Sequence, residues 1–267
     1  MTPTRLHLEL PTLRLSALDY GGPSAGGDGD ERPVVHAEEL SANFAQLFRF
    51  ADGRMGDLPV EPGRGVLAFL ADEEGAQVIR VFKDWARRFL LLETDPTSIE
   101  AESRRASHFL YTDASNFAAW YETVANADSE AAERFRQNLR SVVPGLRSIN
   151  LAPMARGKLF EVVIQQNGHK GQFALDELSG GERALLVLYA VLHFGTGPGA
   201  TLALDEPDNY LALAEIEPFL YQLEDAVMEH GSQLFLASHH PEIFNRWARD
   251  PERCRYFVRG DDGRFRV

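Results

Sequence analysis

The chain has 267 residues and a formal net charge of −13, and its single cysteine, Cys254, excludes an internal disulfide and a cysteine-based zinc module. Its 44% hydrophobic and 25% charged residues are typical of a globular protein with one large domain or two small ones. The sequence has no run near the ~18 apolar residues of a membrane span and no signal-peptide pattern at its start, so we expect a cytoplasmic protein.

The first 41 residues predict an antiparallel meander. Residues 4–20 alternate apolar and polar side chains, which is the period of half-buried strands, and residues 33–40 form another strand-like run. A glycine- and aspartate-rich loop over residues 21–31 separates them.

Residues 42–145 predict a mainly helical part, since apolar residues recur there with a 3.6-residue period. Asp128 and Ser129 suit a helix N-cap, and Glu130 suits the first turn that follows. Helices are expected over 78–89, from 115 or 116, and from 128 or 129 to a point before 144, with a short strand at 90–92.

Residues 146–267 alternate strands with helices, which predicts a mostly parallel sheet with helices on its faces. We therefore expect an α/β fold with three parts, at 1–41, 42–145 and 146–267. In the last part, strands are expected at 148–151, 159–165, 201–204, 233–237, 255–258 and 264–267, and helices at 182–194, 211–230 and 241–248.

The first segment that could carry chemistry opens a helix. Gly180 and Gly181 let backbone N–H groups approach an anion, the helix start adds free donors, and the Ser179 hydroxyl and the Glu182 carboxylate flank them. A plain serine N-cap in a glycine turn explains the same pattern equally well.

The second segment places Asp205 and Glu206 directly after the apolar strand 201–204. At the carboxyl end of a parallel strand, both side chains would point into a ligand crevice. Asp205 suits Mg²⁺, which prefers oxygen ligands, and Glu206 suits the activation of a water molecule. The alternative is a solvated acidic turn.

The third segment, Ser238-His239-His240-Pro241, follows the apolar strand 233–237. A histidine at this point could donate to a phosphate and hold an attacking water. Adjacent histidines in a strand point to opposite faces, so a metal site made by the pair is disfavoured. We prefer His239 for the role because it lies nearer to the strand.

The order and spacing of these segments resemble the second half of an ABC-type ATPase head. Residues 178–182 (Leu-Ser-Gly-Gly-Glu) resemble the signature motif and residues 202–207 (Leu-Ala-Leu-Asp-Glu-Pro) resemble Walker B. Residues 208–211 occupy the D-loop, and residues 238–241 the switch-histidine loop. The Asp-Glu-Pro-Asp-Asn run is closer to the RecF, SMC and OLD-like predicted ATPases of the AAA family than to transporter subunits.

The resemblance implies a P-loop NTPase fold of the ABC type, here its C-terminal lobe with the meander and a helical insertion. It also implies that ATP and Mg²⁺ bind between two heads that dimerise. Asp205 would hold the metal, while Glu206 and His239 would be catalytic. The nucleotide-contacting residues would be Ser179, Gly180, Gly181, Glu182 and Asp208.

The sequence departs from this family in one respect, because it contains no Gly-x-x-x-x-Gly-Lys-Ser/Thr phosphate loop, or Walker A motif. None of its three lysines, Lys83, Lys158 and Lys170, is followed by serine or threonine. Either the loop lies outside these 267 residues, in a truncated part of the chain or on a second chain, or the subunit is degenerate. The resemblance also implies a homo- or hetero-dimer of ATPase heads. A non-catalytic subunit that completes or scaffolds a partner's site is the rival interpretation.

The net charge does not support DNA as a partner, although a local basic strip would allow it. The best basic cluster is formed by Arg134, Arg136, Arg140 and Arg147, which we interpret by default as a solvated helix face. The sequence pattern indicates no membrane partner.

Overall fold

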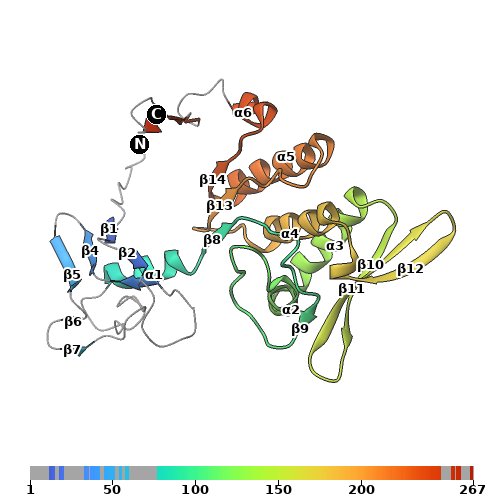
Figure 1. The fold of residues 1–267 in the computed structure, drawn as a ribbon, viewed down its shortest axis with the longest axis horizontal. Helices are drawn as coiled ribbons and strands as arrows, with labels where there is room; N and C mark the ends of the chain where they lie inside the picture. The colour runs from blue at the N-terminus through green and yellow to red at the C-terminus, as the bar shows by residue number, and fades with distance from the viewer. Residues whose placement is uncertain are drawn as a thin grey trace, which may run out of the picture. The chain divides into compact units, whose positions relative to one another are not determined.

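The fold is that of a computed structural model, which describes residues 77–247 without a gap. The chain divides into two compact units, Met1–Arg87 and Arg88–Val267 (Figure 1). The boundaries expected at residues 41 and 145 stay predictions. The shorter described segments are 12–15, 18–20, 33–35, 37–42, 45–51, 54–55, 58–59, 254–255, 257–259 and 265–266. The loop expected at 21–31 lies outside the described residues.

The first unit contains antiparallel strand pairs, and the meander expected over residues 1–41 stays a prediction. One sheet has the order β1-β4-β5-β6-β7, and β2 pairs with β3. The bounds are β1 Thr12–Leu15, β2 Leu18–Tyr20, β3 Pro33–Val35, β4 Ala37–Ala42, β5 Ala45–Ala51, β6 Arg54–Met55 and β7 Leu58–Pro59, followed by helix α1 at Gln77–Ala86.

The expectation that helices dominate from residue 42 onward is wrong for residues 45–59. Phenylalanines flank Arg49 in β5, and such aromatic residues favour strands. An Asp-Gly pair at 52–53, which is a strong hairpin signal, separates β5 from β6 in the sequence.

The second unit has an antiparallel sheet packed on helices. Strand β11 pairs with β10 on one side and with β12 and the short β9 on the other. The turn at Asn167-Gly168 confirms the hairpin signal there, although β12 itself was not expected. The bounds are β9 Glu102–Ser103, α2 Phe117–Ala127, α3 Ser129–Val142, β10 Leu146–Pro153, β11 Lys158–Gln166, β12 His169–Ala174 and α4 Gly180–Phe194.

An aromatic cluster joins this sheet to the helices. The ring of Tyr121 packs against those of Phe135 and Phe160, with centroids 5.3 and 5.2 Å apart, and all three side chains are buried. The predicted cap of α3 is confirmed, since the Asp128 carboxylate accepts a 2.8 Å hydrogen bond from the Ala131 N–H.

A three-stranded parallel sheet in the order β14-β13-β8 forms the other part of the unit. Its strands are β8 at Phe89–Leu92, β13 at Thr201–Asp205 and β14 at Gln233–Ala237. Helix α5 at Leu213–His230 connects β13 to β14, and α6 at Pro241–Trp247 follows β14. The start of α5 is two residues later than expected, because the backbone N–H of Ala212 is capped by the Glu215 carboxylate at 2.9 Å.

The two faces of this parallel sheet differ. Alternate leucines of the three strands join the core that α4 and α5 also form. On the opposite face, Leu91 is 46% exposed and Phe235 is 54% exposed. The apolar run at 233–237 predicts a buried strand, which is wrong for the face that bears Phe235. Successive side chains of β14 point to opposite sides of the sheet, and this side is exposed.

The hairpin β15 (Val258–Arg259) and β16 (Phe265–Arg266) ends the described part of the chain. The turn expected between them lies outside the described residues. None of the described helices has the length and apolar character needed to span a membrane.

A polar network links three helices inside the second unit. The Asn138 amide of α3 lies 3.1 Å from His193 Nε2 of α4 and donates to Gln222 Oε1 of α5 at 2.6 Å. Burial, together with the nearby positive charge of Arg134, lowers the pKa of His193 to about 4. The folded protein therefore keeps this imidazole neutral.

This network predicts a pH-dependent stability. Between about pH 6.5 and pH 4 the unfolded chain binds a proton at residue 193 that the folded chain does not, so the free energy of unfolding falls as the pH falls. The ring keeps some contact with solvent, so we expect a loss of only about 1–2 kcal/mol. Urea unfolding across this range should show a flatter pH dependence for His193→Gln. His108→Gln, at an exposed position, serves as the control, and an unchanged slope in His193→Gln would contradict the prediction.

Candidate functional site

The candidate site lies at the carboxyl edge of the parallel sheet. The last residue of β13, Asp205, is in register with the last residue of β14, Ala237. One residue further, the Glu206 N–H donates to the Ala237 carbonyl at 2.8 Å. The segments that follow both strands therefore leave the sheet side by side, as the crevice rule for parallel strands requires.

Glu206 and His239 meet at this edge. His239 Nε2 lies 3.0 Å from Glu206 Oε1, and the Asn209 amide donates to Glu206 Oε2 at 2.9 Å. The Glu206 side chain is 33% exposed, whereas that of His239 is 95% exposed. Both carboxylate oxygens thus have a partner within the loop cluster, while the imidazole remains open to a ligand.

The backbone at Glu206 adopts a positive φ of 44°, which is uncommon for a residue with a side chain. A strained backbone of this kind persists only when its surroundings hold it, and it occurs often at functional sites. Here the hydrogen bonds from the Glu206 N–H and to its carboxylate hold it. The strain fixes the direction in which the side chain leaves the strand.

Of the two adjacent histidines, the geometry favours His239. His240 Nδ1 instead accepts a hydrogen bond from the Glu242 N–H at 3.2 Å, at the start of α6. The Ser238 hydroxyl donates to Asp208 Oδ1 at 2.8 Å and accepts from the His240 N–H at 2.9 Å. Asp208 therefore ties the loop after β13 to the loop after β14.

Asp205 ends β13 with an exposed side chain. Among the described residues, no group of three or more histidine, cysteine, aspartate or glutamate side chains could form a metal cage. Mg²⁺ does not need one, because it is usually held by one or two carboxylates together with water and substrate phosphates. Asp205 therefore fits the role of a single carboxylate ligand.

The start of α4 forms a complete capping box. The Ser179 side chain accepts from the Glu182 N–H at 3.3 Å, and the Ser179 N–H and hydroxyl lie 2.9 and 2.7 Å from Glu182 Oε2. The N-cap interpretation is therefore confirmed for Ser179. The anion-binding role of this segment stays a prediction.

The two glycines of this segment differ in their surroundings. A Cβ at Gly181 would lie 3.0 Å from the Tyr210 carbonyl oxygen, whereas a Cβ at Gly180 would have only ordinary contacts at 3.8 Å, with Pro96 and Tyr210. The segment after β13 thus packs against the start of α4. Residues 208–210 accordingly contact both the signature-like segment and the histidine loop.

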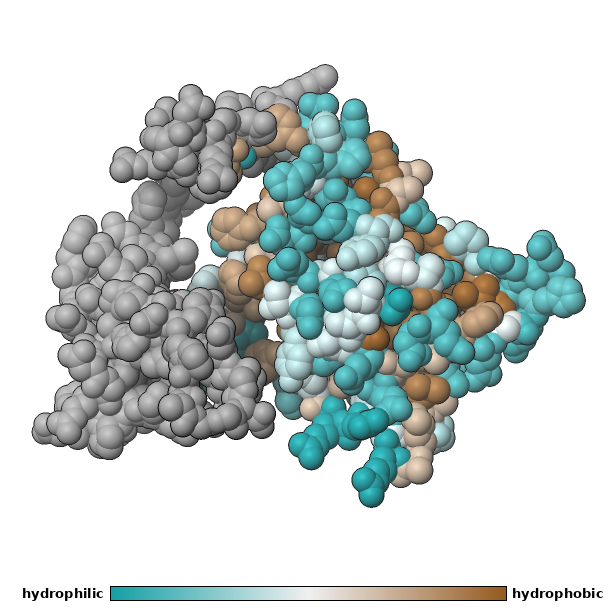
Figure 2. All heavy atoms as spheres, in the orientation of Figure 1, coloured by the Kyte–Doolittle hydropathy of each residue, from teal (hydrophilic) through white to brown (hydrophobic). Residues whose placement is uncertain are grey.

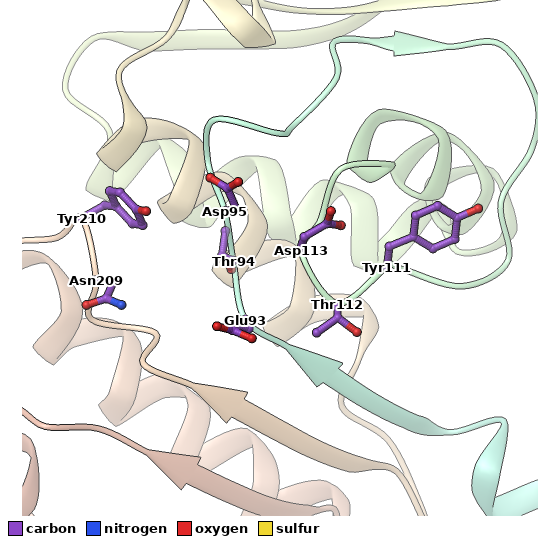
Figure 3. A pocket seen from close by; sticks show the side chains of 8 residues that line it. All are labelled: Glu93, Thr94, Asp95, Tyr111, Thr112, Asp113, Asn209 and Tyr210. Carbon is purple, nitrogen blue, oxygen red and sulfur yellow. The ribbon is translucent and has the colours of Figure 1, made fainter. Parts of the chain in front are cut away.

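A pocket of about 610 Å³ opens beside these loops, at the carboxyl end of β8 (Figure 3). The Thr97 hydroxyl and N–H donate to Asp95 and hold the pKa of that carboxyl below its usual value. The pocket lining consists of Glu93, Thr94, Asp95, Tyr111, Thr112, Asp113, Asn209 and Tyr210.

Neither this pocket nor the hydrogen bond from the Asn209 amide to Glu206 was predicted from the sequence. The rule that singled out Asp205 also applies to Glu93, which directly follows the apolar strand β8. The proximity of Asn209 to Glu206 was open to inference as well, since a polar side chain three residues later in a turn can reach back.

A sequence profile described as "AAA domain, putative AbiEii toxin, Type IV TA system" matches residues 69–245. The chain belongs to this family. The expectation of an AAA-type ATPase family is thereby confirmed, and the α/β architecture with parallel and antiparallel sheets agrees with it.

Two further similarities are narrower. Over 74 residues the chain is 39% identical to an "Antibiotic resistance protein" of Mycobacteroides abscessus, and this stretch spans 28% of the chain but only 12% of that relative. The crystal structure of "the SmcHead bound to the C-winged helix domain of ScpA" superposes with a TM-score of 0.44 and 14% identity, over 82% of this chain and 63% of that one. A TM-score this low supports no inference.

The packing of α4 predicts opposite responses at the two glycines. Gly180→Ala should leave the free energy of unfolding unchanged or raise it by up to about 1 kcal/mol, since alanine restricts the unfolded chain and meets no clash. Gly181→Val should lower it by about 1–3 kcal/mol, because a branched side chain would crowd the Tyr210 carbonyl. Urea unfolding of both variants checks this. Equal free energies of unfolding would show that the Tyr210 carbonyl does not restrict the side chain at position 181.

Proposed function

We propose that this chain is an ABC-type ATPase module that binds and hydrolyses ATP at the interface between two heads. The observation that carries the proposal is the Glu206–His239 pair, 3.0 Å apart at the carboxyl edge of a parallel sheet and next to Asp205. A carboxylate, an imidazole and a second carboxylate at such an edge suit the hydrolysis of a phosphoanhydride.

Each of the three residues has a distinct role in this proposal. The Glu206 carboxylate accepts a proton from the attacking water, and the Asn209 amide fixes its orientation. His239 donates a hydrogen bond to the terminal phosphate, for which its exposed ring is free to turn. Asp205 holds Mg²⁺, which supplies charge neutralisation at the phosphate oxygens.

The start of α4 acts on the nucleotide of the opposite head. Gly180 and Gly181 carry no side chain that would shield the backbone N–H groups of the first helical turn, and the positive end of the helix dipole favours an anion there. Ser179 and Glu182 hold this turn in place through the capping box. The loop after β13 contacts this turn through Tyr210 and the histidine loop through the Asp208–Ser238 hydrogen bond.

The sheet offers a place for the phosphate loop that the sequence lacks. Within the described parallel sheet β14 is an edge strand, and the face bearing Leu91 and Phe235 is apolar and exposed. Parallel sheets are normally covered on both faces, and an open edge is a template for another strand. We propose that a strand from outside these residues pairs with the edge of β14 and that a helix covers the face bearing Leu91 and Phe235. The phosphate loop between them would then lie beside Glu206 and His239.

The family description refers to a toxin of a Type IV toxin–antitoxin system, which supports a role in such a system or a related defence task. The absence of Gly-x-x-x-x-Gly-Lys-Ser/Thr from the sequence favours one alternative, a non-catalytic subunit that completes or scaffolds a partner's ATPase site. Retention of Glu206 argues for the catalytic proposal, because a scaffold needs no base.

The catalytic proposal predicts a specific loss in Glu206→Gln. Labelled ATP is titrated against the full chain alone and then together with a polypeptide that carries the strand, phosphate loop and helix. We expect ATP turnover only in the mixture. In Glu206→Gln the turnover rate of the mixture should fall by at least about a hundredfold while ATP still binds, since the amide cannot accept the proton. Glu217→Gln, an exposed change on α5, is the matched control.

If turnover in this mixture is the same for Glu206→Gln as for the unchanged chain, the catalytic assignment is wrong. If turnover then depends only on a carboxylate of the added polypeptide, the non-catalytic subunit is the correct function.

The docking of the missing segment predicts an effect of Phe235→Arg. A charge on this exposed apolar face should prevent the added polypeptide from binding, because the arginine would have to be buried without a partner. The fold should be retained, as Phe235 is already 54% exposed. Met228→Arg, at a 68% exposed position on α5, should bind normally. Pull-down and thermal unfolding test both points, and normal binding by Phe235→Arg would contradict the docking face.

A further inference from the structure

A second pocket lies at the turn between β10 and β11, where this turn meets β9. Its volume is about 600 Å³. Figure 2 shows strongly hydrophilic and apolar side chains next to each other at the bottom of the view, where Figure 1 has this turn. The pocket is lined by Glu102, Arg104, Arg105, Met154, Ala155 and Arg156.

The backbone that carries these residues is held rigidly. Lys158 of β11 is in register with Ser103 of β9, and Glu122 of α2 binds both, with Lys158 Nζ at 2.8 Å and Ser103 Oγ at 2.5 Å. Gly157 has a φ of +94°, and a Cβ there would overlap the Ser103 carbonyl. The turn therefore fits closely against β9, and the pocket exists before any ligand binds.

The charge of this pocket is opposite to that of the whole chain. Three arginines and one glutamate line it, whereas the chain carries a net charge of −13. The single carboxylate is already used, since Arg104 Nε lies 2.6 Å from Glu102 Oε2. Arg105 and Arg156 form no hydrogen bond or ion pair with another described residue.

The basic cluster on α3 lacks this property. Arg134 and Arg136 form ion pairs with glutamates of their own helix, at 2.9 and 3.0 Å, and Arg140 donates to the Arg147 carbonyl. Arg134, Arg136 and Arg140 lie on α3, as the interpretation as a helix face expects, whereas Arg147 belongs to β10. Of these two basic clusters, the pocket is the one in which arginines without a partner among the described residues lie beside apolar side chains.

We propose that this pocket binds a phosphomonoester attached to a small apolar or aromatic group. Arg105 and Arg156 present planar guanidinium groups that match the oxygens of a phosphate, and a phosphomonoester carries nearly two negative charges. Met154, which is 42% exposed, and Ala155 supply the surface for the apolar group. The volume lies within the range of small-ligand sites.

The net charge of the chain favours a compact anion over a long polyanion, which the rest of the surface would repel. A free phosphorylated small molecule and the 5′-phosphorylated end of a nucleic acid present the same chemistry to the pocket. This site belongs to a different sheet from Glu206 and His239, so it does not depend on the proposed ATPase function.

The methionine methyl groups offer a direct test. The full chain has four methionines, so NMR of methyl-labelled protein gives few signals, and Met154→Leu identifies the one in the pocket. Phenyl phosphate should shift the Met154 signal with a dissociation constant of about 1 mM or lower. The double variant Arg105→Glu/Arg156→Glu should weaken binding by at least about tenfold. The control variant Arg134→Glu/Arg140→Glu changes the charge by the same amount and should bind phenyl phosphate as tightly as the unchanged chain does.

Further ligands distinguish the sources and the chemistry. Binding by a 5′-phosphorylated oligothymidylate, and not by the unphosphorylated one, would support a nucleic-acid end, and binding by phenyl phosphate alone would support a free small molecule. If phenylacetate binds as tightly as phenyl phosphate, any anion suffices, including an acidic peptide, and the proposal is wrong. The proposal is also wrong if phenyl phosphate does not shift the Met154 signal, or if both double variants weaken its binding equally. Glu206→Gln should bind phenyl phosphate normally, even where it abolishes ATP turnover.

Discussion

The candidate site depends on the register between β13 and β14. Because Asp205 pairs with Ala237, the chain leaves the sheet one residue later, where the Glu206 N–H still reaches the Ala237 carbonyl. That bond forces Glu206 into a left-handed conformation, which costs on the order of 1 kcal/mol for a residue with a side chain. A shift in register by one residue would move the carboxylate to the other face of the sheet and away from His239.

The loop of residues 208–210 transmits this geometry to the rest of the site. Asp208 binds Ser238, Asn209 binds Glu206, and the Tyr210 carbonyl packs against Gly181. Tyr210 has a positive φ of 72°, so the loop holds a second strained residue within a few positions of Glu206. A displacement at the start of α4 must therefore alter either this loop or the contacts of the carboxylate. This coupling is physical, through contiguous hydrogen bonds and packing, and does not require motion of the sheet.

Local patterns predicted the elements that present the site, because each follows from neighbours in the sequence. The strand at 201–205, the cap at Ser179 and the strand at 233–237 each combine an apolar run with a polar residue at its end. The exposure of Phe235 was not predictable, since an apolar residue in a strand indicates burial unless the number of neighbouring strands is known. The same holds for the arginine pocket, because the approach of Gly157 to Ser103 joins segments that are distant in the sequence.

Exposure of the site explains why assembly matters to the proposed chemistry. In water, a hydrogen-bonded pair such as Glu206 and His239 gains little energy, and an ordered attacking water competes with bulk solvent. The same pair gains far more where a second polypeptide excludes water and supplies fixed dipoles. His239 is 95% exposed, and Phe235 and Leu91 are exposed on the same parallel sheet, so a polypeptide docked on this sheet could cover the apolar face and desolvate the pair. Docking of a second polypeptide would then cover the apolar face and activate the Glu206 carboxylate in one step. ATP hydrolysis would therefore require this assembly.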